Sequence, residues 1–191
     1  MNKLICVVCG MEINDKNYDF NKEGFITSNH IDNIDTCPFC GANKEYLVQG
    51  GKAIEFGDSG KLDSTTLKII DHAVKLEIFN GDFYKKASKI AKDEKVKKVF
   101  EALSRIEYMH ARIHKKIGGF TEDPVLREMD YSKYNSDEIL LEMACKREKH
   151  AVEYYEKYSS VVEDKNIKSI FKALSMVEEE HIQLTDKGQT L

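Results

Sequence analysis

Two short stretches, EYMH at residues 107–110 and EEEH at residues 178–181, decide the fold of this 191-residue chain. In each, a glutamate is followed three residues later by a histidine, so a helix would present both side chains on one face. The two stretches lie 71 residues apart, and the surrounding sequence repeats with the same offset. Twelve of the 34 positions from Glu77 to His110 are identical in the second copy, which starts at Glu148. The repeat therefore indicates two helical hairpins built on one template.

The template puts acidic side chains and histidines on the apolar faces of these helices. Glu77 and Glu107 lie 16 and 14 residues from Asp93, where the first pair of helices turns, so an antiparallel hairpin brings them to nearly the same height. The second copy repeats this arrangement around Asp164. Single surface Glu-x-x-His pairs are common on polar helices, but two copies on apolar faces predict a buried site.

Buried carboxylates need compensating charge. Without such compensation, burying several carboxylates would cost more free energy than the total stability of a domain, which is about 5–15 kcal/mol. Two divalent cations would neutralise four of them, and one Glu from each of two helices plus Glu-x-x-His from each of the other two is the ligand pattern of ferritin-like di-iron bundles. The six predicted metal ligands are Glu77, Glu107, His110, Glu148, Glu178 and His181.

Apolar residues spaced by three and four predict a mainly α-helical bundle over residues 63–191. The predicted helices span 64–92, 94–117, 135–160 and 165–185, with Asp63 or Ser64 as the first N-cap and a capping box of Asn135 with Glu138 on the third. About 17 residues follow Gly118-Gly119 and could span about 55 Å, which exceeds the about 36 Å of the second helix. We therefore expect a four-helix bundle with one long crossover.

Four of the five cysteines form two Cys-x-x-Cys pairs near the start, CVVCG at residues 6–10 and CPFCG at residues 37–41. Residues 1–45 lack helical periodicity and are predicted to form a small rubredoxin-like or zinc-ribbon-like module, joined to the bundle by a linker over 46–62. Two such pairs make a tetrahedral four-thiolate site for zinc or a single iron. The predicted ligands are Cys6, Cys9, Cys37 and Cys40.

The overall composition narrows the classes of function. A net charge of −4 offers no basic surface for nucleic acid or anionic lipid, and we expect neither as a partner. The sequence contains no run of about 18 apolar residues that could span a membrane, and the start is too cysteine-rich for a secretory signal. Free cysteines arranged as metal ligands are typical of a reducing compartment, so we expect a cytoplasmic protein.

A few further residues lie near the predicted centre. Tyr84 and Tyr155 follow Glu77 and Glu148 on the same faces, where each phenol could donate to a ligand carboxylate on the facing helix. Cys145, one turn before Glu148, is either a small apolar residue or a neighbour of the site. His114 belongs beside the site or on the surface. Gly81 provides either room for a substrate or a close contact between helices.

With these motifs the chain resembles a rubrerythrin, with a rubredoxin-like module in front of a ferritin-like bundle, the order called reverse rubrerythrin. The resemblance implies an enzyme of defence against oxidative stress, in which a four-cysteine iron passes electrons to a di-iron centre that reduces hydrogen peroxide to water. It also implies an NAD(P)H-dependent reductase as electron donor and a homodimer. Glu77 and Glu148 would then be terminal ligands, Glu107 and Glu178 bridges, and His110 and His181 one ligand per iron.

One position departs from the pattern of that family. Rubrerythrins typically carry an additional glutamate one turn after the terminal ligand of the third helix, and this position holds Ala151. Six-ligand centres also occur in oxidases and iron-oxidising ferritins, so a ferroxidase or oxidase that uses dioxygen is an alternative. A second alternative is a metal-binding or sensing module with structural zinc at the four cysteines.

Overall fold

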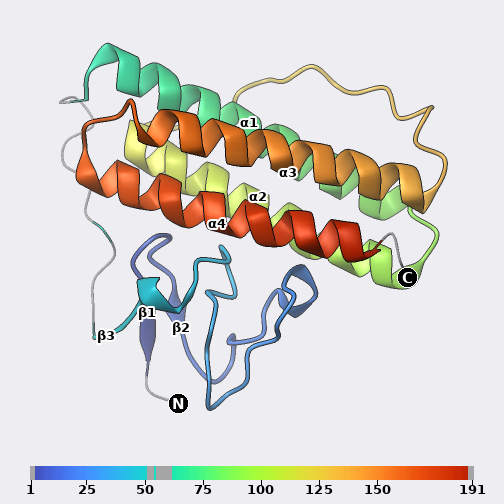
Figure 1. The fold of residues 1–191 in the computed structure, drawn as a ribbon, viewed down its shortest axis with the longest axis horizontal. Coiled ribbons are helices and arrows are strands. Elements are labelled where there is room, and N and C mark those ends of the chain that lie inside the picture. The colour runs from blue at the N-terminus through green and yellow to red at the C-terminus, as the bar shows by residue number, and fades with distance from the viewer. Residues whose placement is uncertain (1–2, 51–53, 55–61, 189–191) are drawn as a thin grey trace.

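The computed structural model describes residues 3–50, 54 and 62–188, and it is mainly helical. Four long helices lie side by side as a bundle: α1 (Ser64–Ile90), α2 (Glu94–Gly118), α3 (Asp137–Ser159) and α4 (Lys165–Gly188). A small module from the start of the chain lies against one side of this bundle (Figure 1). The predicted fold class is confirmed.

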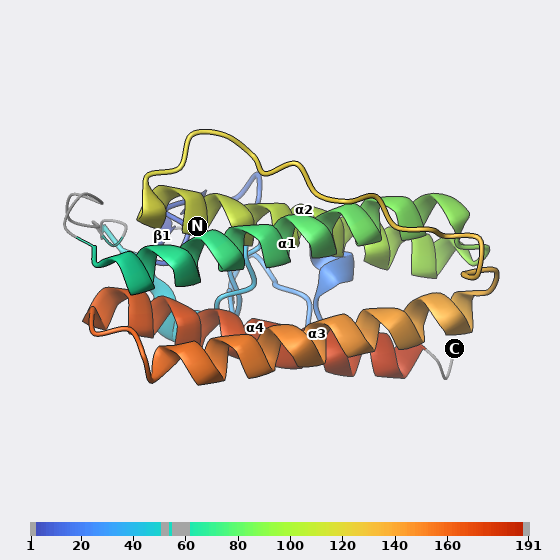
Figure 2. The ribbon, with the colours of Figure 1, turned by 90° about the horizontal axis from the view of Figure 1, so that it is seen from above.

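The four helices form two hairpins, α1 with α2 and α3 with α4. In Figure 2 the segment between α2 and α3 runs along the bundle from one end to the other, so the predicted long crossover is confirmed. Asp137, the first residue of α3, accepts hydrogen bonds of 2.8 Å from the backbone amides of Lys92 and Asp93. This contact anchors the end of the crossover to the turn of the first hairpin.

Side chains at the helix ends explain where the helices begin and stop. The carboxylate of Asp63 accepts from the amides of Thr65 and Thr66 and so caps α1, as one of the two predicted candidates. Gly119, with φ of 70°, ends α2 in the left-handed conformation that glycine favours. The predicted capping box at the start of α3 is wrong: Ser136, not Asn135, is the N-cap and accepts from the amide of Ile139.

That shift of one residue has a local cause. Ser136 has an extended backbone, with φ of −140° and ψ of 158°. Because the next residue, Asp137, is held by the turn of the first hairpin, the chain enters the helix there and not one residue earlier. The other predicted helix ends agree with the observed ones to within three residues, and the last helix extends to Gly188.

The amino-terminal module is built on a three-stranded antiparallel sheet in the order β2-β1-β3. Its elements are β1 (Leu4–Cys6), β2 (Glu12–Ile13), η1 (Lys22–Gly24), η2 (Lys44–Tyr46) and β3 (Leu47–Gln49). Leu4 pairs with Ile13 on one side and with Gln49 on the other. Within the predicted linker, Tyr46 ends η2 and the next three residues form β3, whereas residues 51–53 and 55–61 lie outside the described residues.

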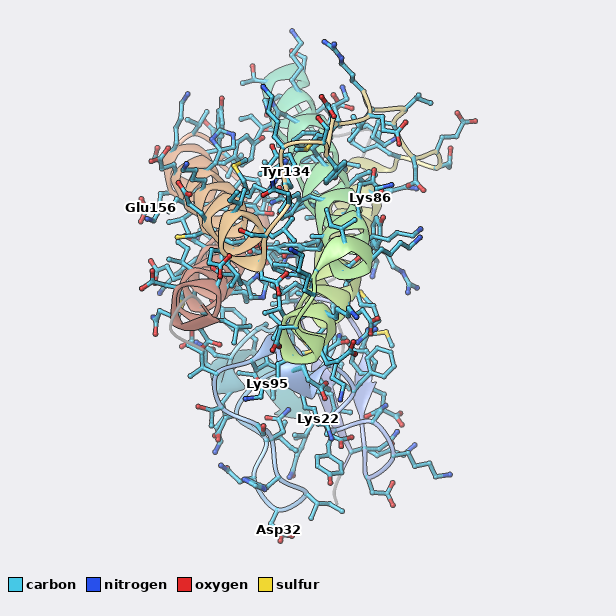
Figure 3. All side chains as sticks on the ribbon, turned by 90° about the vertical axis from the view of Figure 1, so that its right-hand side faces the viewer. Lys22, Asp32, Lys86, Lys95, Tyr134 and Glu156 are labelled. Atoms are coloured by element: carbon cyan, nitrogen blue, oxygen red, sulfur yellow. The ribbon has the colours of Figure 1, made fainter. Side chains whose placement is uncertain are left out.

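The module contacts the bundle through α2 and α4. Asn21 accepts a hydrogen bond of 2.8 Å from Nε of Arg105 on α2. Gly41 lies so close to α4 that an added Cβ would be 2.6 Å from Val177. Figure 3, which looks along the bundle, shows the module beneath the helices with Asp32 at its far tip. The end of the module that carries the second cysteine pair therefore faces the helices.

Among the described residues, no helix is both long and apolar enough to cross a membrane.

Candidate metal centres

The six predicted bundle ligands lie together at the centre of the four helices. Glu77 comes from α1, Glu107 and His110 from α2, Glu148 from α3, and Glu178 and His181 from α4. All six are fully buried. Helical spacing puts each Glu and His pair of α2 and α4 on one face, and the antiparallel hairpins bring the four helices' carboxylates to one level.

The ligand atoms fall into two overlapping groups, in each of which all atoms lie within 4.8 Å of one another. One group contains Glu77 and His110, the other Glu148 and His181, and both contain Glu107 and Glu178. The two oxygens of Glu178 lie 3.0 Å from Nδ1 of His110 and 2.9 Å from Nδ1 of His181. The two oxygens of Glu107 lie 3.7 and 3.2 Å from the same two nitrogens. Glu107 and Glu178 thus lie between two candidate metal positions.

The electrostatics of this cluster favour added positive charge. Burial raises the pKa of Glu77 and of Glu148 well above the ordinary value, and the charges of Glu107 and Glu178 raise it further. Burial disfavours charged imidazole, yet the neighbouring carboxylates of Glu107 and Glu178 raise the pKa of His181 to about 10. The cluster therefore holds protons tightly, and divalent cations would supply the same charge.

The hydrogen bonding of the cluster also fits a metal. Seven buried nitrogen and oxygen atoms of these six side chains make no hydrogen bond among the described residues. Buried polar atoms are rarely left in this state. Carboxylates and imidazoles are the ligands that iron and manganese accept in such bundles. The donor set, its burial and its unpaired atoms therefore suit two divalent metal ions.

Two tyrosines connect the hairpins across the centre. The hydroxyl of Tyr84 on α1 donates to Oε1 of Glu148 on α3, and that of Tyr155 on α3 donates to Oε1 of Glu77 on α1. In each case the second carboxylate oxygen makes no hydrogen bond to any described residue. Each tyrosine therefore orients one carboxylate and leaves its other oxygen available to a metal.

The four predicted cysteine ligands also lie together. The sulfurs of Cys6 and Cys40 are 3.7 Å apart and those of Cys9 and Cys37 are 3.6 Å apart, and none of the four forms a disulfide. Both pairs end in a glycine of positive φ whose amide donates to the carbonyl of the first cysteine. Burial raises the pKa of Cys37 and of Cys40. Such a cluster of four sulfurs suits a tetrahedral metal ion that stabilises thiolates.

The two candidate centres are joined by one buried hydrogen bond. Nε2 of His110 lies 2.9 Å from the carbonyl oxygen of Cys40. Because a carbonyl can only accept, this nitrogen carries the proton, and Nδ1 of the same ring faces the carboxylates. His181 has no such partner, because its Nε2 makes no hydrogen bond among the described residues.

The remaining predicted neighbours have varied surroundings. His114 is fully buried and its Nε2 lies 2.7 Å from the hydroxyl of Tyr155, so it is not a surface residue. Cys145 is buried and belongs to neither group of candidate ligands. At Gly81 an added Cβ would lie 2.9 Å from the ring of Tyr108, which explains the glycine by a close contact between α1 and α2.

The contact between Cys40 and His110 had no sequence signal, because a backbone carbonyl leaves no mark on residue type. The role of His114 had a weak signal, its spacing of one helical turn from His110. The repeat did not support it, because the equivalent position in the second copy is Thr185.

Fold and sites together define a ferritin-like four-helix bundle with a carboxylate-rich candidate dimetal centre, joined to a four-cysteine module. The family model described as Rubrerythrin matches residues 68–134, which cover most of α1, all of α2 and most of the crossover. This match shows that the segment holding the first hairpin and most of the crossover is similar to the rubrerythrin family, and the cysteine cluster is consistent with a rubredoxin-like module. The family implies a non-haem di-iron oxidoreductase. Comparisons with curated proteins and with solved structures gave no significant match.

Proposed function

We propose that this protein reduces hydrogen peroxide to water in defence against oxidative stress, with electrons passed from a four-cysteine iron to a di-iron centre in the bundle. The hydrogen bond of 2.9 Å between His110 and the carbonyl of Cys40 carries the proposal. It joins a candidate ligand of one centre directly to a candidate ligand of the other. Zinc has no redox chemistry, so a relay along this contact requires iron at the cysteines.

Two ferrous ions in the bundle would supply the two electrons that, with two protons, convert one hydrogen peroxide into two water molecules. In this proposal Glu77 and Glu148 would be terminal ligands, Glu107 and Glu178 would be bridges, and His110 and His181 would bind one iron each. The tyrosines orient the terminal carboxylates. Complete burial of the ligands keeps bulk water away from the reacting atoms.

One observation favours a second candidate function. Ala151, which is fully buried, occupies the position one turn after Glu148 where the resemblance to rubrerythrins leads us to expect an additional glutamate. A centre with six ligands is also compatible with an oxidase or ferroxidase that uses dioxygen. The two candidates differ in the oxidant that the reduced protein consumes faster.

The proposal includes two partners that the resemblance implies, a reductase and a second copy of the chain, and the cellular location that the sequence indicates. Electrons reach the four-cysteine iron from NAD(P)H through a separate reductase. The working assembly is a homodimer. A cytoplasmic location suits this electron supply, because the cytoplasm provides the reductant and keeps the cysteines reduced.

A visible spectrum of the anaerobically reduced protein, recorded before and after one equivalent of hydrogen peroxide, tests the relay. We expect the ferric–thiolate band of the cysteine site to return promptly, and orders of magnitude faster with peroxide than with dioxygen. Equal rates, or a faster reaction with dioxygen, would support the second candidate. A protein that never shows this band holds zinc at the cysteines, and the relay is then wrong.

A matched pair of cysteine variants tests whether the electrons pass through the module. Cys9→Ala removes one of the four sulfurs and should abolish the consumption of electrons from an external donor, while the bundle keeps its metals. Cys145→Ala removes the fifth cysteine, which lies outside both candidate centres, and should leave this consumption unchanged. If both variants retain full consumption, the electrons bypass the module.

A further inference from the structure

A buried histidine outside the six candidate ligands reaches the centre through a tyrosine. Nε2 of His114 lies 2.7 Å from the hydroxyl oxygen of Tyr155, and that hydroxyl donates to Glu77. A phenol has one hydrogen, and here it goes to the carboxylate. The oxygen of Tyr155 must therefore accept from His114, so Nε2 of His114 carries a proton.

The surroundings of His114 hold it in this state. Burial, together with the neighbouring His110, lowers the pKa of His114 to about 3, so its ring is neutral and has a single N–H group. Nδ1 makes no hydrogen bond among the described residues. The ring stacks on Tyr155 with centroids 5.7 Å apart and meets the edge of Phe171 at 5.8 Å. These contacts keep Nε2 directed at the tyrosine.

The second half of the bundle lacks this arrangement. Tyr84 donates to Glu148, but the position equivalent to His114 is Thr185. Thr185 is fully buried, and its hydroxyl lies 2.9 and 3.1 Å from the carbonyls of His181 and Ile182 in its own helix. Its one hydrogen is therefore committed to the helix. Among the described residues nothing donates to the oxygen of Tyr84.

Given the dimetal centre of the proposed function, we propose that His114 is a positioning residue that makes the two ends of that centre unequal. By donating to Tyr155 it commits the tyrosine hydrogen to Glu77, which fixes one oxygen of Glu77 and directs the other at its metal. A hydrogen bond accepted by a phenol also strengthens the one it donates. Among the described residues, Glu148 accepts a hydrogen bond only from Tyr84, which has no donor behind it. The end with Glu77 and His110 is the tighter metal site, and coordination changes occur at the end with Glu148 and His181.

The first test measures metal binding without turnover. The full chain, with zinc at the cysteines, is titrated with Mn²⁺, and the two stepwise dissociation constants are followed by electron paramagnetic resonance. His114→Leu keeps the side-chain volume but removes the hydrogen-bond donor, and it should weaken the binding of one of the two ions by about 10–100-fold. His114→Gln, whose amide can donate in place of Nε2, should restore most of the loss. Thr185→Val is the matched control in the other half and should change neither constant.

A double-mutant cycle shows whether the effect passes through Tyr155. In a Tyr155→Phe background His114→Leu should cause no further loss, whereas in a Tyr84→Phe background it should cause its full loss. Equal effects in both backgrounds, or equal losses for the Leu and Gln variants, would overturn the proposal. Thermal melting of the metal-free variants shows that each is folded.

Nitrogen-15 spectra of the metal-free protein provide an independent readout. The imidazole of His114 should be neutral, with its proton on Nε2, and a proton on Nδ1 instead would contradict the proposal. The proposed function can fail separately. If Mn²⁺ binds at two unequal sites but the iron-loaded protein does not react with peroxide, His114 keeps its role and only the activity is wrong.

Discussion

In the first hairpin, α1–α2, the imidazole of the candidate ligand His110 donates to the carbonyl of Cys40 in the module. Glu77 accepts a hydrogen bond from Tyr155, whose hydroxyl lies within hydrogen-bonding distance of His114. In the second hairpin, α3–α4, the equivalent His181 has an Nε2 without a partner among the described residues. Glu148 accepts a hydrogen bond from Tyr84, and no described residue donates to Tyr84 in turn. The two hairpins thus contribute the same set of candidate ligands, two glutamates and one histidine, but surround them differently.

This difference separates what the centre requires from what the rest of the protein adds. Four buried carboxylates must be balanced by charge, so the ligand residues are equivalent in both hairpins. The hydrogen bonds that surround these residues are not needed for this charge balance, so they can differ between the hairpins. They differ because the module contacts one imidazole, and because His114 and Thr185 differ in what they can donate.

The largest expected effect comes from changing a residue that both halves share. Glu107→Ala removes a carboxylate that lies near both imidazoles, and it should abolish binding of both bundle metals while the cysteine site keeps its own. Glu148→Ala removes a carboxylate of one group only and should remove one ion. Metal analysis of both variants checks this, with the exposed Glu101→Ala as control. Loss of a single ion in Glu107→Ala would show that this residue is not a bridge.

The next effect concerns the stability of the metal-free protein at different pH. A group whose pKa is raised by folding stabilises the folded state at low pH and loses that contribution as pH rises. Folding raises the pKa of His181 from 6.5 to about 10. It also raises the pKa of Glu77 and of Glu148. The melting temperature should therefore fall as pH rises from 6.5 to 10, and much less when Mn²⁺ is bound. Glu77→Gln and Glu148→Gln should reduce this dependence of melting temperature on pH equally. A clear difference between the two variants would show that the two halves contribute unequally to the charge of the cluster.

A smaller effect is expected where the module contacts the helices. Gly41 has φ of 76°, and an added Cβ would lie 2.6 Å from Val177. Gly41→Ala should therefore destabilise the protein by about 1–3 kcal/mol more than the control, displace Cys40 from His110, and slow electron transfer to the bundle. The control is Gly50→Ala, which has φ of 59° but no atom within 4 Å of the added Cβ. Denaturant unfolding and the peroxide-driven return of the ferric–thiolate band measure both effects, and unchanged electron transfer would contradict the route through Cys40.

The smallest effect should be the same in both halves. Asp93 and Asp164, equivalent in the repeat, cap α2 and α4 by accepting from two backbone amides each. Asp93→Ala and Asp164→Ala should each cost about 1 kcal/mol of stability. Urea unfolding of the two variants compares them, and a loss in only one would show that the hairpins differ in their backbone as well as around the metals.

Features that depend on residue type and spacing were predictable from the sequence. The six candidate bundle ligands repeat at an offset of 71, and the apolar positions around them repeat as well, so the structure brings these side chains together. The four helices and the crossover followed from periodicity and length. The cap of α3 was less predictable because Asn135 and Ser136 are both good cap residues, and a distant contact of Asp137 decides between them.

Features that depend on contacts between distant segments were not predictable. Cys40 and His110 are 70 residues apart, and their hydrogen bond uses a backbone carbonyl that any residue would offer. The position of the module on α2 and α4 is determined by shape, such as the close approach of Gly41 to Val177. No pattern along the chain encodes such a fit.

The offset of 71 residues is what the duplication of one hairpin would leave in a sequence. One hairpin supplies two glutamates and one histidine, which is half of the bundle's candidate ligand set. Two identical hairpins could therefore assemble into an ancestral bundle whose centre had two equivalent ends. A chain with two hairpins but a single cysteine module cannot keep that equality, because the module reaches only one imidazole. In the proposed relay, a single cysteine module would therefore serve two halves of the centre, and electrons would enter through the half that contains His110.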